Sequence, residues 1–337
     1  MNVSLNSSLK EYNTFGIDVK ARQFISVTSP DELRQVLKNN YSKDLFILGG
    51  GSNMLLTKDI DATVIHVALK GKELLSKTED HVLVRISAGE NWHETVLWTL
   101  DHNWGGLENL SLIPGNTGTA PIQNIGAYGV ELKDTFVSCE VIDIQTLETR
   151  TFTKEQCDFD YRSSIFKTSD KGKYIITSVV FRLSRKNHKL NTQYGSIKEA
   201  LDEMGIKNPG INDVSTAVIK IRRQKLPDPK ELGNSGSFFK NPAIPVPQLR
   251  KLQEKYPHIP SYTVSDKFVK VPAGWLIDQA GFKGYREGDA GVHKNQALVL
   301  VNYGEASGNE ILQLARKIQH KIKQEYGIDL EPEVNIY

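Results

Sequence analysis

The chain has 337 residues, which is enough for two or three domains of ordinary size. Its 42 Lys and Arg residues nearly balance its 40 Asp and Glu residues, so the formal net charge is only +2. This excludes the positive excess typical of proteins held on nucleic acid or on an acidic membrane. A hydrophobic content of 39% with 24% charged residues also excludes a disordered chain.

The cysteine spacing and the N-terminal residues indicate in which cellular compartment the protein works. Cys139 and Cys157 are too far apart for a C-x-x-C motif and too few for the disulfide framework of a secreted protein. The first twenty residues hold no apolar signal-peptide core, and no apolar stretch is long enough to cross a membrane. We therefore expect a cytoplasmic protein. The eight histidines are scattered without metal-ligand spacing, so no metal site is expected.

Six segments in the first two thirds of the chain predict β-strands: 23–27, 45–49, 63–69, 82–89, 137–144 and 174–184. Each is apolar or alternating and rich in β-branched residues. Two helices are expected among them. One begins at the capping residue Ser29, with Pro30 at the first helical position and Glu32 three residues after the cap, and the other covers residues 91–102.

The last third has helical periodicity at residues 213–224, 247–256, 273–280 and 309–326. Pro227 and Pro229 stop a helix shortly after Lys225, and we expect a domain boundary there. Strands first and helices later indicate an α+β fold rather than a strict βαβ alternation.

The predicted strand 45–49 runs into a glycine-rich turn, Gly49-Gly50-Gly51-Ser52-Asn53. Glycines let backbone amides come within hydrogen-bonding distance of an anion because no Cβ intervenes. The segment lacks the third glycine of a Rossmann fingerprint and the lysine of a P-loop. Two interpretations stay open from these residues: a phosphate-binding turn, and a tight turn without a ligand.

A second glycine-rich segment, residues 109–130, contains no charged residue. Its core reads IPGNTGTAPIQNIGAYG. Such a run offers backbone N–H and C=O groups to a large, flat, mostly neutral ligand without competing charges. A buried structural loop is the alternative.

Together, GGGSN and IPGNTGTAPIQNIGAYGVE resemble the FAD-binding half of the UDP-N-acetylenolpyruvoylglucosamine reductases, also called UDP-N-acetylmuramate dehydrogenases, of bacterial peptidoglycan synthesis. The early motif Asn13-Thr14-Phe15-Gly16 is similar to the same family, and later motifs appear in the family's order over nearly the whole chain. The resemblance implies an α+β FAD-binding fold of the vanillyl-alcohol oxidase type with a separate C-terminal α+β substrate-binding domain. The expected parts are FAD-binding subdomains at 1–68 and 69–218, a substrate-binding domain at 219–327 and a C-terminal strand at 328–337.

The resemblance implies non-covalent FAD, and no His or Cys lies between Gly105 and Phe136 to attach it. The residues expected at the cofactor are Gly49, Gly50, Gly51, Ser52, Asn53, Pro114, Gly115, Gly118, Thr119, Ala120, Gln123, Asn124, Gly126, Ala127, Tyr128 and Tyr161.

The resemblance also assigns three catalytic residues. Arg162, in Tyr161-Arg162-Ser163-Ser164, is expected at the enolpyruvyl carboxylate, which a planar guanidinium can grip with two parallel hydrogen bonds. Ser237 is the expected proton donor, although by its residues alone this segment suits a turn cap equally well and is not G-x-S-x-G. Glu333 in LEPEV is expected beside the reacting double bond. Asn335 departs from the family, since many relatives have Arg there.

Substrate contacts are expected from lysines and polar residues, because a nucleotide diphosphate brings negative charge to a nearly neutral protein. For each lysine alone, a solvated surface role is the alternative. Tyr194-Gly195-Ser196 is similar to the tyrosine loop of the subgroup with a closing lid; a tyrosine can stack on uracil and hydrogen-bond a phosphate. The expected residues are Tyr194, Lys225, Asn241, Tyr262, Lys270, Lys283 and Gln296.

The expected function is therefore an NADPH-dependent flavoprotein reductase that converts UDP-N-acetylglucosamine enolpyruvate to UDP-N-acetylmuramate. We expect it to act as a monomer, with no nucleic acid or membrane partner. Two alternatives are a flavin oxidase of a small alcohol on the same fold, and a non-catalytic sensor of flavin or nucleotide sugar. Arg162, Ser237 and Glu333 together argue against the sensor, because a binding protein needs no proton donor.

Overall fold

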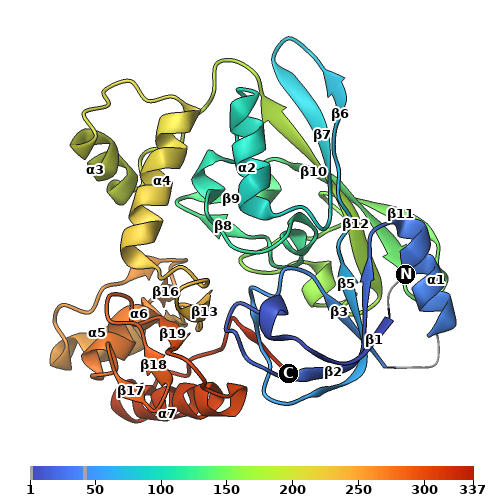
Figure 1. The fold of residues 1–337 in the computed structure, drawn as a ribbon. Coiled ribbons are helices and arrows are strands. Elements are labelled where there is room, and N and C mark those ends of the chain that lie inside the picture. The colour runs from blue at the N-terminus through green and yellow to red at the C-terminus, as the bar shows by residue number, and fades with distance from the viewer. Residues whose placement is uncertain (1–2, 41–43) are drawn as a thin grey trace. The chain divides into compact units, whose positions relative to one another are not determined.

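The computed structural model describes residues 3–40 and 44–337 and divides into two compact units (Figure 1). Unit 1 comprises the described residues up to Ser7, Ala21–Gly50 and Ile60–Gln224. Unit 2 comprises Ser8–Lys20, Gly51–Asp59 and Lys225–Tyr337. The second unit therefore takes two short segments from the N-terminal part of the chain.

The first sheet of unit 1 has the strand order β1-β2-β5-β3, with β2 and β3 both parallel to β5. Helix α1 packs Leu33, Val36 and Leu37 against Ile25 and Ile65 of this sheet. The cap is the expected one, since the Ser29 side chain accepts a hydrogen bond from the Glu32 amide. The bounds are β1 (Val3–Ser8), β2 (Lys20–Val27), α1 (Pro30–Asn39), β3 (Leu45–Leu48) and β5 (Ile60–Val67).

The second sheet of unit 1 is antiparallel, with the order β11-β10-β12-β7-β6. One face is covered by α2, whose Trp92 and Val96 pack on alternate residues of β7 such as Val84 and Ile86. The bounds are β6 (Lys72–Lys77), β7 (His81–Ser87), α2 (Trp92–Asp101), β10 (Phe136–Asp143), β11 (Thr149–Thr153) and β12 (Tyr174–Ser184).

Cys139 and Cys157 lie in the core beneath this second sheet as free thiols. A hydrogen bond between the two side chains, together with burial, raises the pKa of Cys139. Both thiols are therefore packing residues here, in agreement with the absence of a C-x-x-C motif.

The six predicted strands correspond to β2, β3, β5, β7, β10 and β12, and the two predicted helices to α1 and α2. Unit 1 also contains the hairpin β8 (Gly126–Ala127) and β9 (Val130–Glu131) and the paired helices α3 (Gly195–Glu203) and α4 (Ile211–Lys225) (Figure 1). Helix α3 was not expected, because only Ile197, Ala200 and Leu201 are buried along it. They pack with Val214 and Val218 of α4.

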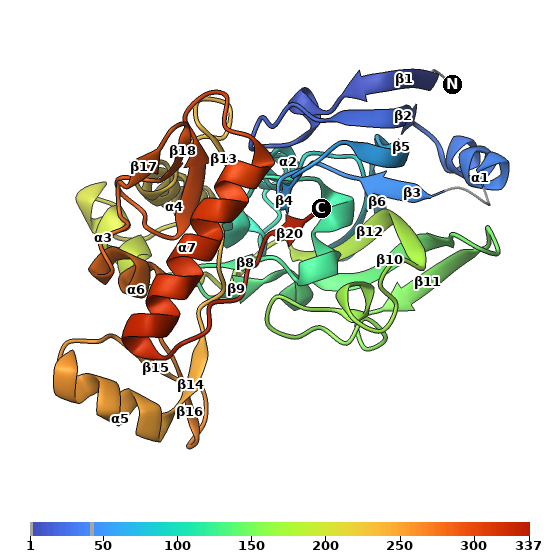
Figure 2. The ribbon, with the colours of Figure 1, turned by 90° about the horizontal axis from the view of Figure 1, so that it is seen from below.

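Unit 2 is built on an antiparallel sheet with the order β13-β19-β18-β17 and a smaller sheet with the order β14-β16-β15. Strand β20 lies parallel to β4 (Figure 2). The bounds are β4 (Met54–Leu55), β13 (Gly233–Ser237), β14 (Ala243–Pro245), α5 (Val246–Lys255), β15 (Tyr262–Thr263), β16 (Phe268–Lys270), α6 (Ala273–Gln279), β17 (Arg286–Glu287), β18 (Ala290–Val292), β19 (Val299–Asn302), α7 (Gly308–Tyr326) and β20 (Asn335–Ile336).

The helices predicted in the last third are present as α4, α5, α6 and α7. The short strands between them were missed, because segments of two to five residues are too short for a visible alternation.

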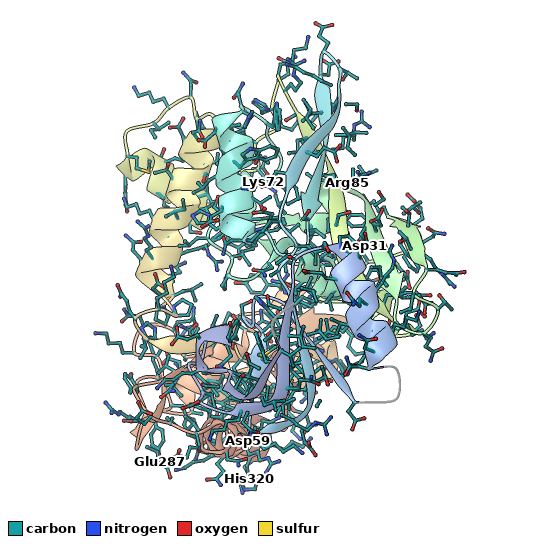
Figure 3. The ribbon with its side chains drawn as sticks, turned by 45° about the vertical axis from the view of Figure 1, so that its right-hand side comes forward. Asp31, Asp59, Lys72, Arg85, Glu287 and His320 are labelled. Carbon is teal, nitrogen blue, oxygen red and sulfur yellow. The ribbon has the colours of Figure 1, made fainter. Side chains whose placement is uncertain are left out.

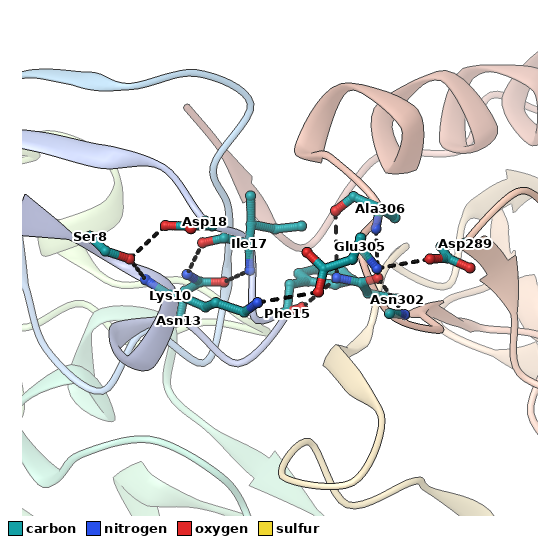
Figure 4. Close-up of polar contacts among 11 residues, drawn as sticks. Ser8, Lys10, Asn13, Phe15, Ile17, Asp18, Asp289, Asn302, Glu305 and Ala306 are labelled. Atoms are coloured by element: carbon teal, nitrogen blue, oxygen red, sulfur yellow. Dashed lines mark hydrogen bonds and ion pairs between the residues drawn. The ribbon is translucent and has the colours of Figure 1, made fainter.

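Two buried asparagines hold the segment Ser8–Lys20 of unit 2: Asn13 fixes its internal turn, and Asn302 joins it to β19 (Figure 4). Asn13 Nδ2 donates to the carbonyls of Leu9 and Ile17, at 2.7 and 2.9 Å, and Asn13 Oδ1 accepts from the Ile17 amide. Asn302 Nδ2, from β19, donates to the Phe15 carbonyl at 3.0 Å. The motif Asn13-Thr14-Phe15-Gly16 is thus fixed by hydrogen bonds to backbone, which explains the amide at its first position.

Charged side chains project into solvent along the elements, as Lys72, Arg85 and Asp31 show in Figure 3. They form exposed ion pairs, such as Arg85 Nη1 with Glu73 Oε2 at 3.0 Å. Exposed pairs of this kind contribute about 0–1 kcal/mol each. The fold of each unit therefore depends on its apolar core and its buried hydrogen bonds.

The four-part division at residues 68, 218 and 327 stays a prediction. Among the described residues, no helix is long and apolar enough to span a membrane. Residues 3–40 and 44–337 also contain no group of three His, Cys, Asp or Glu side chains placed to hold a metal ion.

Candidate active site

In unit 1 the two glycine-rich segments lie against each other. A Cβ on Gly49 would lie 2.4 Å from Thr119 Cγ2. A Cβ on Gly50 would lie 2.9 Å from both Gly115 Cα and Asn116 Oδ1. Only a residue without a Cβ allows this approach, so the two segments require glycine where they meet. These residues fit the phosphates of a dinucleotide cofactor.

The backbone of residues 115–118 follows the end of β7 and the start of α2. The Gly115 carbonyl accepts from the Trp92 amide at 3.0 Å, and the Gly118 amide donates to the Ala88 carbonyl at 2.9 Å. A Cβ on Gly118 would lie 2.4 Å from Ala88 Cβ. Two predicted cofactor residues, Gly115 and Gly118, are thus hydrogen-bonded to the start of α2 and the end of β7, which holds their backbone in place.

Hydrogen bonds of the predicted cofactor residue Asn124 fix the turn that follows it. Asn124 is fully buried and has a left-handed φ of 43°. Its Nδ2 donates to Glu131 Oε2 at 3.1 Å and to the Asp160 carbonyl at 3.2 Å, while its Oδ1 accepts from the Lys133 amide. All polar groups of the side chain therefore bind protein, and Asn124 positions the backbone before Arg162.

Arg162 is fixed on hairpin β8–β9. Its Nη2 donates to the Gly126 carbonyl at 2.7 Å, and a Cβ on Gly126 would lie 3.0 Å from Arg162 Nη1. The guanidinium also lies over the Tyr161 ring, 5.5 Å from its centroid. Arg162 has a φ of 55°, a conformation that side chains rarely adopt and that surrounding contacts must hold. A cation is thereby placed on the segment expected to bind the flavin.

Sequence reasoning missed a second half-buried cation, Arg222. Its Nε donates to the carbonyl of Leu112 at 3.2 Å, and Leu112 itself has a φ of 58°. Burial lowers the pKa of Arg222, a hydrogen bond to Tyr128 raises it, and the charge of Arg162 lowers it further. In the sequence, Arg222 precedes another arginine near the end of a helix, a pattern typical of exposed residues, so no local signal marked it.

The Leu112 amide is bound by His93, which was also missed. This amide donates to His93 Nδ1 at 3.0 Å, so the imidazole must be neutral at that nitrogen. Burial, followed by the charges of Arg223 and Arg222, lowers the pKa of His93 below its usual 6.5. His93 and Arg222 thus bind both the amide and the carbonyl of Leu112, a strained residue two positions before Pro114.

The predicted lid residue Tyr194 lies at the start of α3, 55% exposed. Its ring meets the ring of Tyr128 edge to face, with 5.7 Å between centroids. Tyr128 is half-buried against the α3–α4 cluster, and burial raises the pKa of its phenol. Two residues predicted for different ligands, Tyr128 and Tyr194, are thus in direct contact.

In unit 2, Ser237 at the end of β13 lies near the segment that carries Glu333, just before β20. Ser237 ends β13 after a bulge at Gly236, whose φ is +69°. The next residue, Phe238, accepts at its carbonyl from the Glu333 amide at 2.8 Å. Residues far apart in the sequence are therefore brought together by backbone pairing alone.

Asn335 connects the end of the chain to the turn at Gly51-Ser52-Asn53. Its Nδ2 donates to the Asn53 carbonyl at 2.9 Å, and Asn53 Nδ2 donates to the Glu333 carbonyl at 3.3 Å. The amide at 335 is thus a hydrogen-bond donor to backbone.

The predicted substrate residues of unit 2 fall into two groups. Tyr262 and Lys270 are cross-strand partners on β15 and β16. Asn241 and Gln296 both lie at the start of α6: Asn241 Oδ1 accepts from the Ala273 amide at 2.9 Å, and Gln296 Oε1 would lie 3.2 Å from a Cβ on Gly274.

The two remaining predicted lysines differ in their surroundings. Lys283 Nζ forms an ion pair with Asp278 Oδ2 at 3.0 Å, whereas Lys225 is exposed at the end of α4.

Comparison with known families places the chain in a class. A family model of the FAD-binding domain matches residues 21–150, and a model described as the C-terminal domain of UDP-N-acetylenolpyruvoylglucosamine reductase matches residues 228–337. The chain is an FAD-dependent oxidoreductase with a separate C-terminal domain, which confirms the expected fold class and cofactor.

Full-length relatives give the family. The chain is 60% identical over 336 residues to UDP-N-acetylenolpyruvoylglucosamine reductase of Flavobacterium johnsoniae, covering 100% of both chains. It is 50% identical to the Pseudomonas putida protein of that name, covering 98% of this chain and 97% of the relative. The chain therefore belongs to the UDP-N-acetylenolpyruvoylglucosamine reductase family, as its motifs predicted.

The crystal structure of the reductase from Thermus caldophilus has the same fold, with a TM-score of 0.70, 24% identity, and coverage of 100% of this chain and 98% of that one. The subgroup with a tyrosine lid and the individual site residues stay predictions.

A Gly50→Val variant should lose FAD. The valine side chain would enter space occupied by Gly115 Cα and Asn116 Oδ1, at 2.9 Å from the first added atom, and would push the two glycine-rich segments apart. We expect at least about tenfold weaker flavin binding, or about 1.4 kcal/mol, measured by fluorescence titration. Gly210→Val is the matched control, because its Cβ would meet only Asp213 Oδ2, at 3.7 Å. Equal flavin binding by both variants would contradict this role for Gly50.

His93 should make stability fall in acid. The folded protein keeps the imidazole neutral to accept from the Leu112 amide, whereas the unfolded chain takes up a proton near pH 6.5. Its contribution is therefore complete above pH 6.5 and is lost as the pH falls toward the lower folded pKa. Urea titrations from pH 7.5 to 5 should show a steeper loss in the wild type than in His93→Gln, while the exposed His320→Gln follows the wild type (Figure 3). Parallel curves for wild type and His93→Gln would exclude this titration.

Proposed function

We propose that this chain reduces UDP-N-acetylglucosamine enolpyruvate to UDP-N-acetylmuramate, with NADPH as reductant and FAD held without a covalent bond. Membership of the reductase family supports the reaction. The observation that carries the assignment of chemistry is the hydrogen bond from the Glu333 amide to the carbonyl of Phe238, the residue after Ser237. Addition of a proton to a carbon requires a positioned proton donor, and this contact keeps the segments of Ser237 and Glu333 together.

FAD, when bound, supplies the hydride chemistry of the reaction. The residues that would hold it include the glycines at 49–50 and 115–118, where the two glycine-rich segments approach each other closely. Tyr161 and residues 123–128 would lie along the rest of the cofactor.

Arg162 would bind the enolpyruvyl carboxylate. Its Nη2 donates to the Gly126 carbonyl, which orients the guanidinium. A planar guanidinium suits a carboxylate because it can form two parallel hydrogen bonds with it. Charge that builds on the carboxylate during reduction is stabilised by the same contact.

Ser237 would hold the proton at Oγ and deliver it to the carbon that carries enolate character. Glu333, on the paired segment, would orient this hydroxyl and the reacting double bond. The conformation of the bulge at Gly236 aims residue 237, because the Gly236 amide donates to Asn234 Oδ1 at 2.9 Å.

Substrate binding would use Tyr194, Lys225, Asn241, Tyr262, Lys270, Lys283 and Gln296. We propose further that the enzyme acts as a monomer, and that it does so in the cytoplasm, because both substrates are soluble nucleotides. Size-exclusion chromatography with light scattering tests the oligomeric state.

Anaerobic spectroscopy separates this function from its alternatives. The purified protein should be yellow, NADPH should bleach it, and the enolpyruvyl nucleotide should restore the colour with formation of the lactyl product. A small-alcohol oxidase would instead be bleached by alcohol and restored by oxygen. A sensor would change its spectrum on binding the nucleotide without reoxidation. Either result would replace the proposed function.

Ser237→Ala should slow only the half-reaction in which the enolpyruvyl nucleotide reoxidises the flavin. Bleaching by NADPH should stay within about twofold of the wild type, because that step does not use the hydroxyl. Reoxidation by the enolpyruvyl nucleotide should slow by about 10²–10⁴-fold, the usual contribution of general acid catalysis. Ser235→Ala is the matched control in the same strand, since Ser235 Oγ donates to the Met54 carbonyl and its loss should reduce stability only. Stopped-flow traces with unchanged reoxidation in Ser237→Ala would remove Ser237 from the mechanism.

A further inference from the structure

One buried amide in unit 1 binds two segments at once. Asn109 is 1% exposed, and its Nδ2 donates to the Tyr128 carbonyl at 3.1 Å and to the Asn191 carbonyl at 2.8 Å. Within the described residues, its Oδ1 has no hydrogen-bond partner. The side chain is therefore held in place by its two donated bonds, since the flipped amide would set an oxygen against two carbonyls.

Asn191 completes a second connection between the same segments. Its Nδ2 donates to the Gly129 carbonyl at 3.0 Å. Gly129 has a φ of +79°, and a Cβ there would lie 2.9 Å from Asn191 Nδ2. The connection thus requires glycine at 129, both for its backbone conformation and for space.

The segment held by Asn191 leads directly to Tyr194. Leu190 packs into both hydrophobic clusters of this region, one under the second sheet and one between α3 and α4. Tyr194 then accepts from the Ile197 amide at 2.8 Å and places its ring against Tyr128. Between these points, Asn191 connects the segment 191–193 to the turn at 126–130, through a hydrogen bond between two neutral groups.

We propose that Asn109 and Asn191 are positioning residues for Tyr194, and that together they form an amide latch between residues 187–194 and the turn at 126–130. The proposal rests on the proposed function, in which Tyr194 contacts the nucleotide substrate. The same turn carries Arg162 at Gly126. The latch therefore sets the position of Tyr194 relative to the cation that would bind the enolpyruvyl carboxylate.

Asn191→Ala tests the latch with little damage to the core, because Asn191 is only half-buried. Loss of one net hydrogen bond should raise the KM for the enolpyruvyl nucleotide by about 2- to 10-fold. Bleaching by NADPH, flavin affinity and melting temperature should stay unchanged, whereas a merely structural role would lower the last two. Gln193→Ala, exposed in the same segment, is the matched control and should keep the wild-type KM.

A double-mutant cycle tests whether Asn191 acts through Tyr194. In a Tyr194→Ala background, Asn191→Ala should change KM by less than about twofold, because the positioned ring is already absent. An undiminished effect of Asn191→Ala in that background would overturn the proposal.

Hydrogen exchange gives a readout that does not depend on the reaction. Amides of residues 190–197 should exchange faster in Asn191→Ala than in wild type, in the flavin-loaded protein without substrate, and Gln193→Ala should match wild type. Unchanged exchange would exclude the latch even if the enzyme is active. A wild type that fails to reduce the enolpyruvyl nucleotide would refute the proposed function while leaving the exchange test of the latch valid.

Discussion

Close backbone approach at the Gly49-Gly50-Gly51 turn is the constraint on which both units depend. On Gly50, a Cβ would meet the backbone of Gly115 at 2.9 Å; on Gly51, a Cβ would meet the Tyr12 carbonyl oxygen at 1.9 Å. The first contact belongs to unit 1 and the second to unit 2, since the chain changes unit between these two residues. A side chain at position 50 would therefore displace Gly115, a predicted cofactor residue, and one at position 51 would displace the backbone at Tyr12. Glycine at these positions leaves room for the neighbouring backbone, although it loses more conformational entropy on folding than a larger residue would.

Buried amides take the role that charged residues play in many ligand-binding proteins. Asn13, Asn109, Asn124 and Asn302 each bind two or more backbone groups of turns. A neutral amide satisfies donors and acceptors without the desolvation penalty of a buried ion. The turns are thus fixed without adding charge near the expected flavin. Arg162 and Arg222 are cations in these surroundings, where solvent only weakly screens their attraction to a carboxylate or phosphate.

Local patterns were enough for much of unit 1. The strands alternate or are continuously apolar, Ser29 caps α1, and the absence of charge over residues 109–130 marked the segment that meets Gly50. Family motifs then supplied the roles of Arg162, Ser237 and Glu333. Their roles could not follow from composition, because a Tyr-Arg pair or a Glu near a terminus has no distinctive local signature.

Long-range hydrogen bonds were beyond sequence reasoning. The assignment of Ser8–Lys20 and Gly51–Asp59 to unit 2 depends on contacts such as Asn302 Nδ2 with the Phe15 carbonyl, across 287 positions. Arg222, His93, Asn109 and Asn191 were missed for the same reason: each binds a backbone group, and a backbone group leaves no mark on the sequence. Helix α3 was missed because its buried face is short.

The amide at position 335 has a consequence for how the proposed substrate is held. Asn335 donates to the Asn53 carbonyl, so it secures β20 against β4 with a neutral group and adds no cation beside Glu333. An arginine at this position would add one positive charge for an anionic substrate. Lys283 already shares its charge with Asp278. In the proposed function, the neutral contacts that place Tyr194 therefore gain importance, because fewer long-range attractions orient the ligand.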